Sequence, residues 1–177
     1  MSQPIAWLLA VFAVLSAASA AEPPGVASTS QSTSQTISTP AFLTVAVANH
    51  KFEIASSQLA LRKTQSSVVR GFAHQMILDY QVAAMKLKQA VADAKLPAPR
   101  EALDAGHKAL LDELTRTPPG KTLSKAYLEA QEKALREDLP IFEAYARGGD
   151  NERLKVFAEE MVPVLRGHLE QLAKLRK

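Results

Sequence analysis

Hydrophobic residues recur at intervals of three and four from Phe42 almost to the end of the chain, which is the spacing of one face of an α-helix. No stretch of the sequence shows the sustained alternation of a half-buried strand. The fold class is therefore predicted to be all-α. The five expected apolar stripes are Phe42–Ala60, Val69–Val91, Leu103–Leu114, Leu123–Tyr145 and Leu154–Leu175.

Residues typical of helix ends separate these stripes. Thr39-Pro40 offers a hydroxyl cap and a proline in the first turn of the first helix. Gly148-Gly149 predicts a left-handed stop after the fourth helix. The other expected boundaries are Ser66 or Ser67 for the second helix, about Asp104 and Thr115 for the third, about Thr122 and Arg147 for the fourth, and Asp150 or Asn151 as the cap of the fifth.

Four long amphipathic helices and one short one predict a four-helix bundle with the additional short helix in the crossover. Pro140 and Pro163 lie inside two of the helices, and each is expected to remove one backbone hydrogen bond and to bend its helix. The segment Arg70–Met76 is similar to Lys155–Met161 at an offset of 85 residues. This similarity fits a bundle of two related hairpins, although two amphipathic helices can also acquire it by chance.

The charge distribution sets the first 50 residues apart from the bundle. All 21 Lys and Arg lie from Lys51 onward, and Glu22 is the one charged side chain before that position. The apolar run Ile5–Leu15 is shorter than the roughly 20 residues of a spanning helix, and Ala18-Ser-Ala20 fits a signal-peptidase site. Residues 1–20 are therefore interpreted as a cleavable signal peptide, with a short buried or interfacial helix as the alternative. Export predicts a periplasmic or outer-membrane-associated protein with no transmembrane segment in the mature chain.

The segment that follows the predicted signal peptide is rich in small and polar residues. Of the 18 residues from Pro23 to Pro40, 15 are Pro, Gly, Ser, Thr or Gln. Such a segment has too little apolar surface to offset the entropy cost of ordering, so residues 21–40 are predicted to be a disordered linker. A modified Ser/Thr stalk is the alternative interpretation. Residues 41–177 are then the helical bundle domain.

The overall charge of +3 does not indicate a nucleic-acid interface, because residues of both signs are interspersed and aromatic residues make up only 6% of the chain. A solvated surface is the favoured interpretation. Weak attraction to anionic lipid or polysaccharide in the cell envelope is the alternative.

Five short motifs follow each other along the helical part of the chain: Phe72–Met76, Leu103–Asp112, Tyr127–Gln131, Ile141–Glu143 and Leu165–Glu170. In order and spacing they resemble the exported bacterial proteins grouped as domain of unknown function family 4142. The resemblance extends over about Phe42 to Leu172 and implies a ferritin-like helical bundle with no established activity.

A metal site inside the bundle is the most specific chemical hypothesis. Ferritin-like di-metal proteins use inward Glu residues and Glu-x-x-His pairs, because residues three apart face the same side of a helix. The resemblance implies a His after Asp79 and another in the fourth helix, but this chain has Tyr80 and the segment Glu132–Leu135 there. No cofactor is expected, although a divalent metal ion is possible. The remaining candidate ligands are Glu53, Asp79, Asp138 and His168.

The favoured alternative to a metal site is a buried hydrogen-bonded cluster of Glu53, Tyr80 and His168, since buried polar groups need partners. His107 is expected to serve packing or capping of the short helix. His50 and His74 lie off the main stripes and are expected to face solvent.

The sequence contains none of the common catalytic patterns. It has no Gly-rich phosphate loop, no Cys nucleophile and no recognisable Ser-His-Asp arrangement. Two function classes therefore remain. The first is a non-catalytic envelope bundle that packs against an unknown protein or surface, and the second is a divalent-metal-binding bundle with a reduced ligand set.

Overall fold

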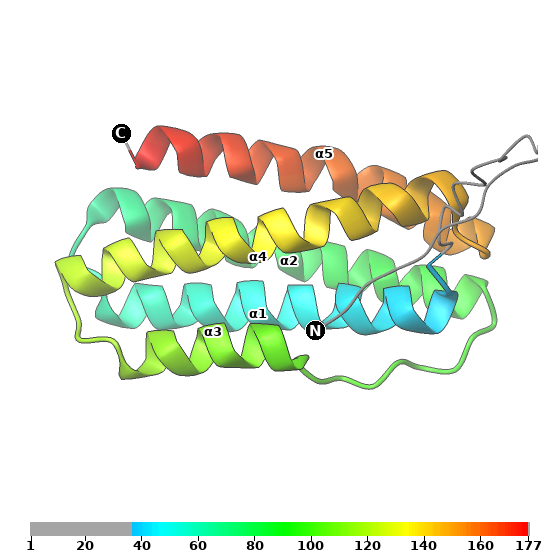
Figure 1. Ribbon diagram of the computed structural model, residues 1–177, viewed down its shortest axis with the longest axis horizontal. Helices are drawn as coiled ribbons and strands as arrows, with labels where there is room; N and C mark the ends of the chain where they lie inside the picture. The colour runs from blue at the N-terminus through cyan, green and yellow to red at the C-terminus, as the bar shows by residue number, and fades with distance from the viewer. Residues whose placement is uncertain (1–36, 177) are drawn as a thin grey trace, which may run out of the picture. The chain divides into compact units, whose positions relative to one another are not determined.

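The computed structural model of the protein describes residues 37–176 and contains five α-helices in that range (Figure 1). Each helix begins within two residues of its predicted start, and α3 and α4, for which the sequence also predicts an end, end within one residue of it. The described residues include no strand, so the all-α prediction is confirmed. The helices are α1 (Thr39–Lys63), α2 (Ser67–Asp93), α3 (Ala105–Arg116), α4 (Lys121–Gly148) and α5 (Glu152–Leu175).

The four long helices form two antiparallel hairpins, α1 with α2 and α4 with α5 (Figure 1). A long connection joins the hairpins, so that α2 and α4 run in the same direction. The short α3 lies within this connection and packs against α1 and α4. This is the predicted four-helix bundle with one crossover. When the sequence is shifted by 85 residues, α1 aligns with α4 and α2 with α5. The sequence similarity therefore relates the first hairpin to the second.

The predicted stripes form the core. Every member of the α2 stripe is buried, from Val69 to Val91, and so is every member of the α4 stripe, from Leu123 to Tyr145. At one end of the bundle the rings of Phe42 and Tyr145 stack, with their centroids 4.0 Å apart. Each large side chain buried in this way contributes about 1.5–3 kcal/mol.

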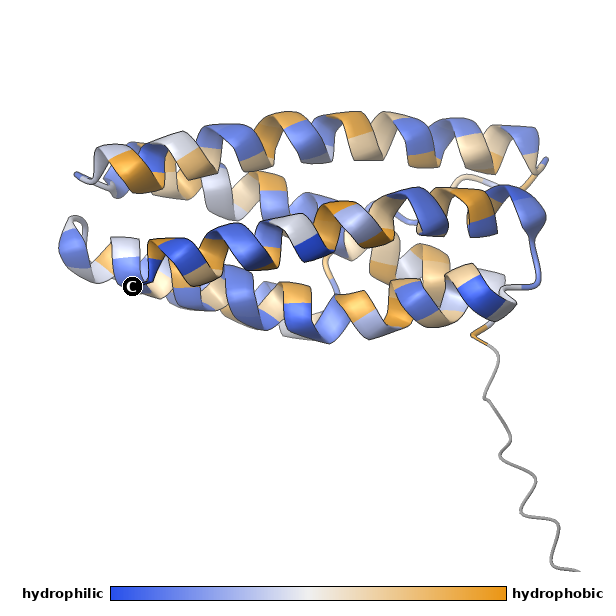
Figure 2. Cartoon of the chain, turned by 90° about the horizontal axis from the view of Figure 1, so that it is seen from above, coloured by the Kyte–Doolittle hydropathy of each residue, from blue (hydrophilic) through white to orange (hydrophobic). Residues whose placement is uncertain are grey.

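Hydrophilic and hydrophobic residues alternate along each helix (Figure 2), and the large hydrophobic side chains that remain exposed include Val68, Leu78, Val82, Met85 and Val156. Among the described residues, no helix is both long and apolar enough to cross a membrane. The predicted signal peptide, residues 1–20, and most of the predicted linker lie outside the described residues. The last two linker positions, 39 and 40, belong to α1.

Side-chain caps fix the starts of three helices. The Ser66 hydroxyl accepts from the Val69 amide, the Asp104 carboxylate from the His107 amide, and the Asn151 side chain from the Arg153 and Leu154 amides. Asn151 is thus the residue that caps α5. The predicted Thr39 cap is wrong, because the Thr39 hydroxyl instead bonds Asp150 and Tyr145 at the far end of the chain.

The glycines after α4 act differently from the prediction. Gly149 has a φ of −60°, so the stop is not left-handed. A Cβ atom at Gly149 would lie 2.5 Å from the Tyr145 ring, so glycine is required there by close packing. The left-handed glycine is Gly120, with a φ of 92°, immediately before α4.

Candidate functional site

Polar side chains gather in the middle of the bundle, where apolar packing is otherwise continuous. The inward face of α1 contributes three of them, Asn49, Glu53 and Ser56, which follow each other at helical spacing of four and three. The opposite helices α2, α3, α4 and α5 each add at least one. These central polar residues are Asn49, Glu53, Ser56, Tyr80, His107, Gln131, Asp138 and His168, all at most 6% exposed.

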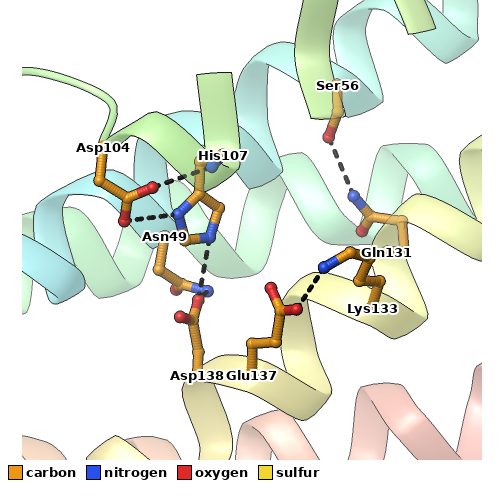
Figure 3. A network of polar contacts seen from close by, with 8 residues as sticks. All are labelled: Asn49, Ser56, Asp104, His107, Gln131, Lys133, Glu137 and Asp138. Carbon is orange, nitrogen blue, oxygen red and sulfur yellow. Dashed lines mark hydrogen bonds and ion pairs between the residues drawn. The ribbon is translucent and has the colours of Figure 1, made fainter. Parts of the chain in front are cut away.

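Asp138 is the hub of one hydrogen-bonded group (Figure 3). Its Oδ2 accepts from Asn49 Nδ2 at 2.7 Å and lies 3.1 Å from His107 Nε2. The other ring nitrogen of His107, Nδ1, is 2.9 Å from Asp104 Oδ2. Burial by itself lowers the pKa of His107, but the hydrogen bonds and charges of Asp138 and Asp104 outweigh it and raise the pKa to about 9. A protonated His107 between two carboxylates therefore ties α3 to α4.

Glu53 lies one helical turn from Asn49 and has a different environment. It is 0% exposed, and neither carboxylate oxygen has a hydrogen-bond partner among the described residues. Burial, reinforced by the charge of Asp138, raises the pKa of Glu53 well above 4.5 against a weaker opposing effect of Gln131 and His107. Burial therefore favours the protonated, neutral form of Glu53.

Further buried polar atoms around Glu53 also lack partners among the described residues. They are Tyr80 Oη, Asn49 Oδ1 and Gln131 Oε1, while Gln131 Nε2 donates to Ser56 Oγ at 2.9 Å. An unsatisfied buried polar group costs about 1–3 kcal/mol, and native structures contain few of them. Several in one place indicate a centre with unused capacity to bind a water molecule or an ion.

The other two candidate ligands, Asp79 and His168, pair at the edge of this polar group, between α2 and α5. His168 Nε2 is 2.9 Å from Asp79 Oδ2, and both residues line a hollow of about 360 Å³. The Asp79 side chain is 31% exposed, so this pair lies at the edge of the core. The structure thus divides the four candidate metal ligands into Glu53 with Asp138 and Asp79 with His168. Within residues 37–176, no three His, Asp or Glu side chains are grouped as metal ligands.

The predicted hydrogen-bonded cluster of Glu53, Tyr80 and His168 is only partly present. All three residues are buried, and the Tyr80 and His168 rings are 5.5 Å apart. The predicted hydrogen bonds among them are wrong, because the side chains of Glu53 and Tyr80 have no partner within residues 37–176 and His168 bonds Asp79 instead. Side chains on different helices form a hydrogen bond only when each helix is oriented about its axis so that they face each other. The sequence does not show these orientations.

Two histidines differ from the expectations drawn from the sequence. The expected capping role of His107 is confirmed, because its amide and its ring both bond the Asp104 cap of α3, but its ring also reaches Asp138, which the sequence does not predict. The prediction for His50 is wrong, since it is 3% exposed. Because α2, α3 and α4 all pack against α1, the buried arc of α1 is wider than one stripe. His74 is exposed, as predicted.

A separate hollow of about 610 Å³ lies between α1, α2 and the 94–104 segment, and we call it the α1–α2 groove. Its rim carries Lys51, Lys88 and Glu101, and His50 contributes to its lining. The lining is otherwise apolar and includes Val47, Ile54, Ala84, Leu87, Val91 and Leu96.

Comparisons with known proteins place the chain in a family without providing a function. No curated protein and no solved structure matches it. A family model described as "Domain of unknown function (DUF4142)" matches residues 22–175, which is nearly the whole chain. The bundle and its polar centre are thus those of a protein that belongs to the domain of unknown function family DUF4142.

Proposed function

We propose that this protein is an exported helical bundle that acts by binding rather than by catalysis, and that the α1–α2 groove is its binding surface. The observation that carries the proposal is that the buried polar centre and the open, mainly apolar α1–α2 groove are separate. The central polar residues Glu53, Tyr80 and Gln131 are 0% exposed, which supports a structural role for them. Most of the groove lining is apolar and its charged residues lie at the rim, which favours binding of an apolar ligand over chemistry.

The size of the groove favours a small molecule over a protein partner. Small-molecule sites measure about 300–1,000 Å³, and the volume of about 610 Å³ falls within this range. A stable protein interface buries about 800 Å² on each partner, which needs a broader surface. We therefore take the occupant to be a small molecule with an apolar chain. The protein partner suggested by the sequence stays a prediction.

A neutral fluorescent probe, N-phenyl-1-naphthylamine, is expected to bind the purified full chain and to lose at least about tenfold in affinity in Ala84→Phe. The added ring occupies the groove, and tenfold corresponds to about 1.4 kcal/mol. Ala144→Phe is the matched control, because Ala144 is another half-buried helical alanine that does not line the groove. Unchanged probe binding in Ala84→Phe, or no binding to the wild-type chain, contradicts the proposal.

The export part of the proposal is supported by the apolar run Ile5–Leu15 and the small residues before Ala21. It predicts that protein purified from the cell envelope begins at or near Ala21. Amino-terminal sequencing of the periplasmic and outer-membrane fractions measures this directly. Recovery of the intact chain from the cytoplasmic fraction alone argues against export.

A divalent metal ion in the polar centre is the second candidate function, and the unpartnered oxygens around Glu53 favour it. Two carboxylates with amide and phenol oxygens are donors suited to a hard cation such as Mg²⁺ or Ca²⁺. Glu53, Asn49, Gln131 and Tyr80 would hold the ion through their unpartnered oxygens, with Asp138 as the second carboxylate. The ion would replace the proton of Glu53 and compensate the charge of both carboxylates, and Asp79 and His168 would remain paired with each other.

The metal proposal predicts that a saturating divalent ion stabilises the wild-type chain. An ion present at 100 times its Kd adds about 2.7 kcal/mol to the free energy of unfolding. Glu53→Gln is expected to abolish this gain while His168→Ala retains it. Thermal unfolding with and without Mg²⁺, Ca²⁺, Mn²⁺ or Zn²⁺, together with elemental analysis of the purified protein, provides the test. The absence of both bound and stabilising ions excludes this function.

A further inference from the structure

The rim of the α1–α2 groove carries more positive than negative charge. Lys51 Nζ lies 3.1 Å from Glu101 Oε2, and these side chains are 38% and 70% exposed. Lys88 is exposed and forms no ion pair with any other described residue. Exposed ion pairs contribute little, so a ligand anion can compete with Glu101 for Lys51. The groove therefore offers a ligand anion the free ammonium group of Lys88, and that of Lys51 when the anion replaces Glu101.

The far side of the groove is held in a defined shape. The α2 helix ends with Lys95 in the left-handed region, at a φ of 55°. The Lys95 amide donates to the Ala92 carbonyl and the Leu96 amide to the Val91 carbonyl, the hydrogen bonds of a Schellman motif. This motif fixes Leu96 close to Val91, and both residues line the groove. The lining is thus preformed, which reduces the entropy cost of binding a ligand.

Resting on the proposed binding function, we propose that the groove takes an anionic single-chain amphiphile, the class of a free long-chain carboxylate. The chain lies among Val47, Ile54, Leu87 and Leu96, and the carboxylate bonds Lys88. Apolar burial supplies most of the affinity, in proportion to the number of methylene groups removed from water. The lysines select the sign of the headgroup, because an ammonium ligand would meet two like charges and one Glu101 carboxylate.

Displacement of N-phenyl-1-naphthylamine by three chains of equal length tests the headgroup. Dodecanoate is expected to displace the probe from the full-length protein at least about tenfold more effectively than dodecan-1-ol or dodecylammonium, all below their micelle concentrations. In Lys88→Gln the advantage of dodecanoate over dodecan-1-ol is expected to fall about tenfold, the scale of one charge-assisted hydrogen bond. Lys121→Gln is the control, since Lys121 is an exposed lysine outside the groove.

The outcomes separate the headgroup from the binding function itself. Equal displacement by all three chains, or an unchanged advantage of dodecanoate in Lys88→Gln, overturns the anionic headgroup but leaves apolar binding in the groove. Failure of the probe to bind at all overturns both proposals. Binding to vesicles that contain anionic phospholipid, without binding of monomeric dodecanoate, also overturns the free carboxylate and identifies a membrane surface instead.

Discussion

Replacing Asp138 with alanine is expected to lower the free energy of unfolding by about 3–5 kcal/mol, the scale for removing one partner of a buried charged pair. The carboxylate is 3% exposed and serves two groups, Asn49 Nδ2 at 2.7 Å and His107 Nε2 at 3.1 Å. Alanine leaves both groups without their acceptor. It also removes the link between α3 and α4, so α3 is expected to lose protection from hydrogen exchange before the other helices.

Two variants on the same helix are controls for this loss. Asp138→Asn keeps an oxygen that can accept a hydrogen bond and removes only the charge, so its loss is expected to be smaller. Glu137→Ala removes the adjacent exposed carboxylate, which pairs with Lys133, and is expected to change stability by no more than about 1 kcal/mol. Urea unfolding followed by circular dichroism at 222 nm compares the four proteins. A loss below about 1 kcal/mol in Asp138→Ala contradicts a central role for this network.

Acidification from pH 7 to pH 4 is expected to cost the wild-type protein about 3 kcal/mol more than it costs His50→Phe. Burial lowers the pKa of His50 from 6.5 to about 4. In this interval the unfolded chain binds a proton at His50 and the folded chain does not, so stability falls as the pH falls. The interval from 6.5 to about 4, at about 1.36 kcal/mol per pH unit, gives the expected size.

The difference between the two proteins in the stability lost from pH 7 to pH 4 reports the contribution of His50 alone. The raised pKa of Glu53 acts with the opposite sign, because it stabilises the folded state at low pH and loses this effect as the pH rises. Glu53 is present in both proteins, so its contribution largely cancels. The rings nearest His50 are Tyr80 and Phe157, at 5.9 Å each, and neither supplies a positive or negative charge at these pH values. His74→Gln, at an exposed position, is the control. Parallel stability curves for wild type and His50→Phe contradict the prediction.

The sequence predicted which single residues of the candidate site are buried, but not which of them contact each other. Asn49, Glu53, Asp138 and His168 lie on apolar stripes, so periodicity correctly indicates that they are buried. Their partners depend on how the helices are rotated about their axes. Asp138 meets Asn49 and His107 across three helices, whereas His168 meets Asp79 at the edge of the bundle. The sequence therefore predicted four candidate ligands but not their division into two pairs.

By itself, the sequence determined the local features of this protein: five helices, their stripes, the starts of the helices to within two residues, and the family. These features depend on residues only a few positions apart, which the periodicity and the capping residues report. Only the tertiary structure decided the burial of His50, the contact of Thr39 with Asp150 and the shape of the α1–α2 groove. Each of these requires segments distant in sequence to pack together, and the width of the buried arc on a helix depends on how many neighbours surround it.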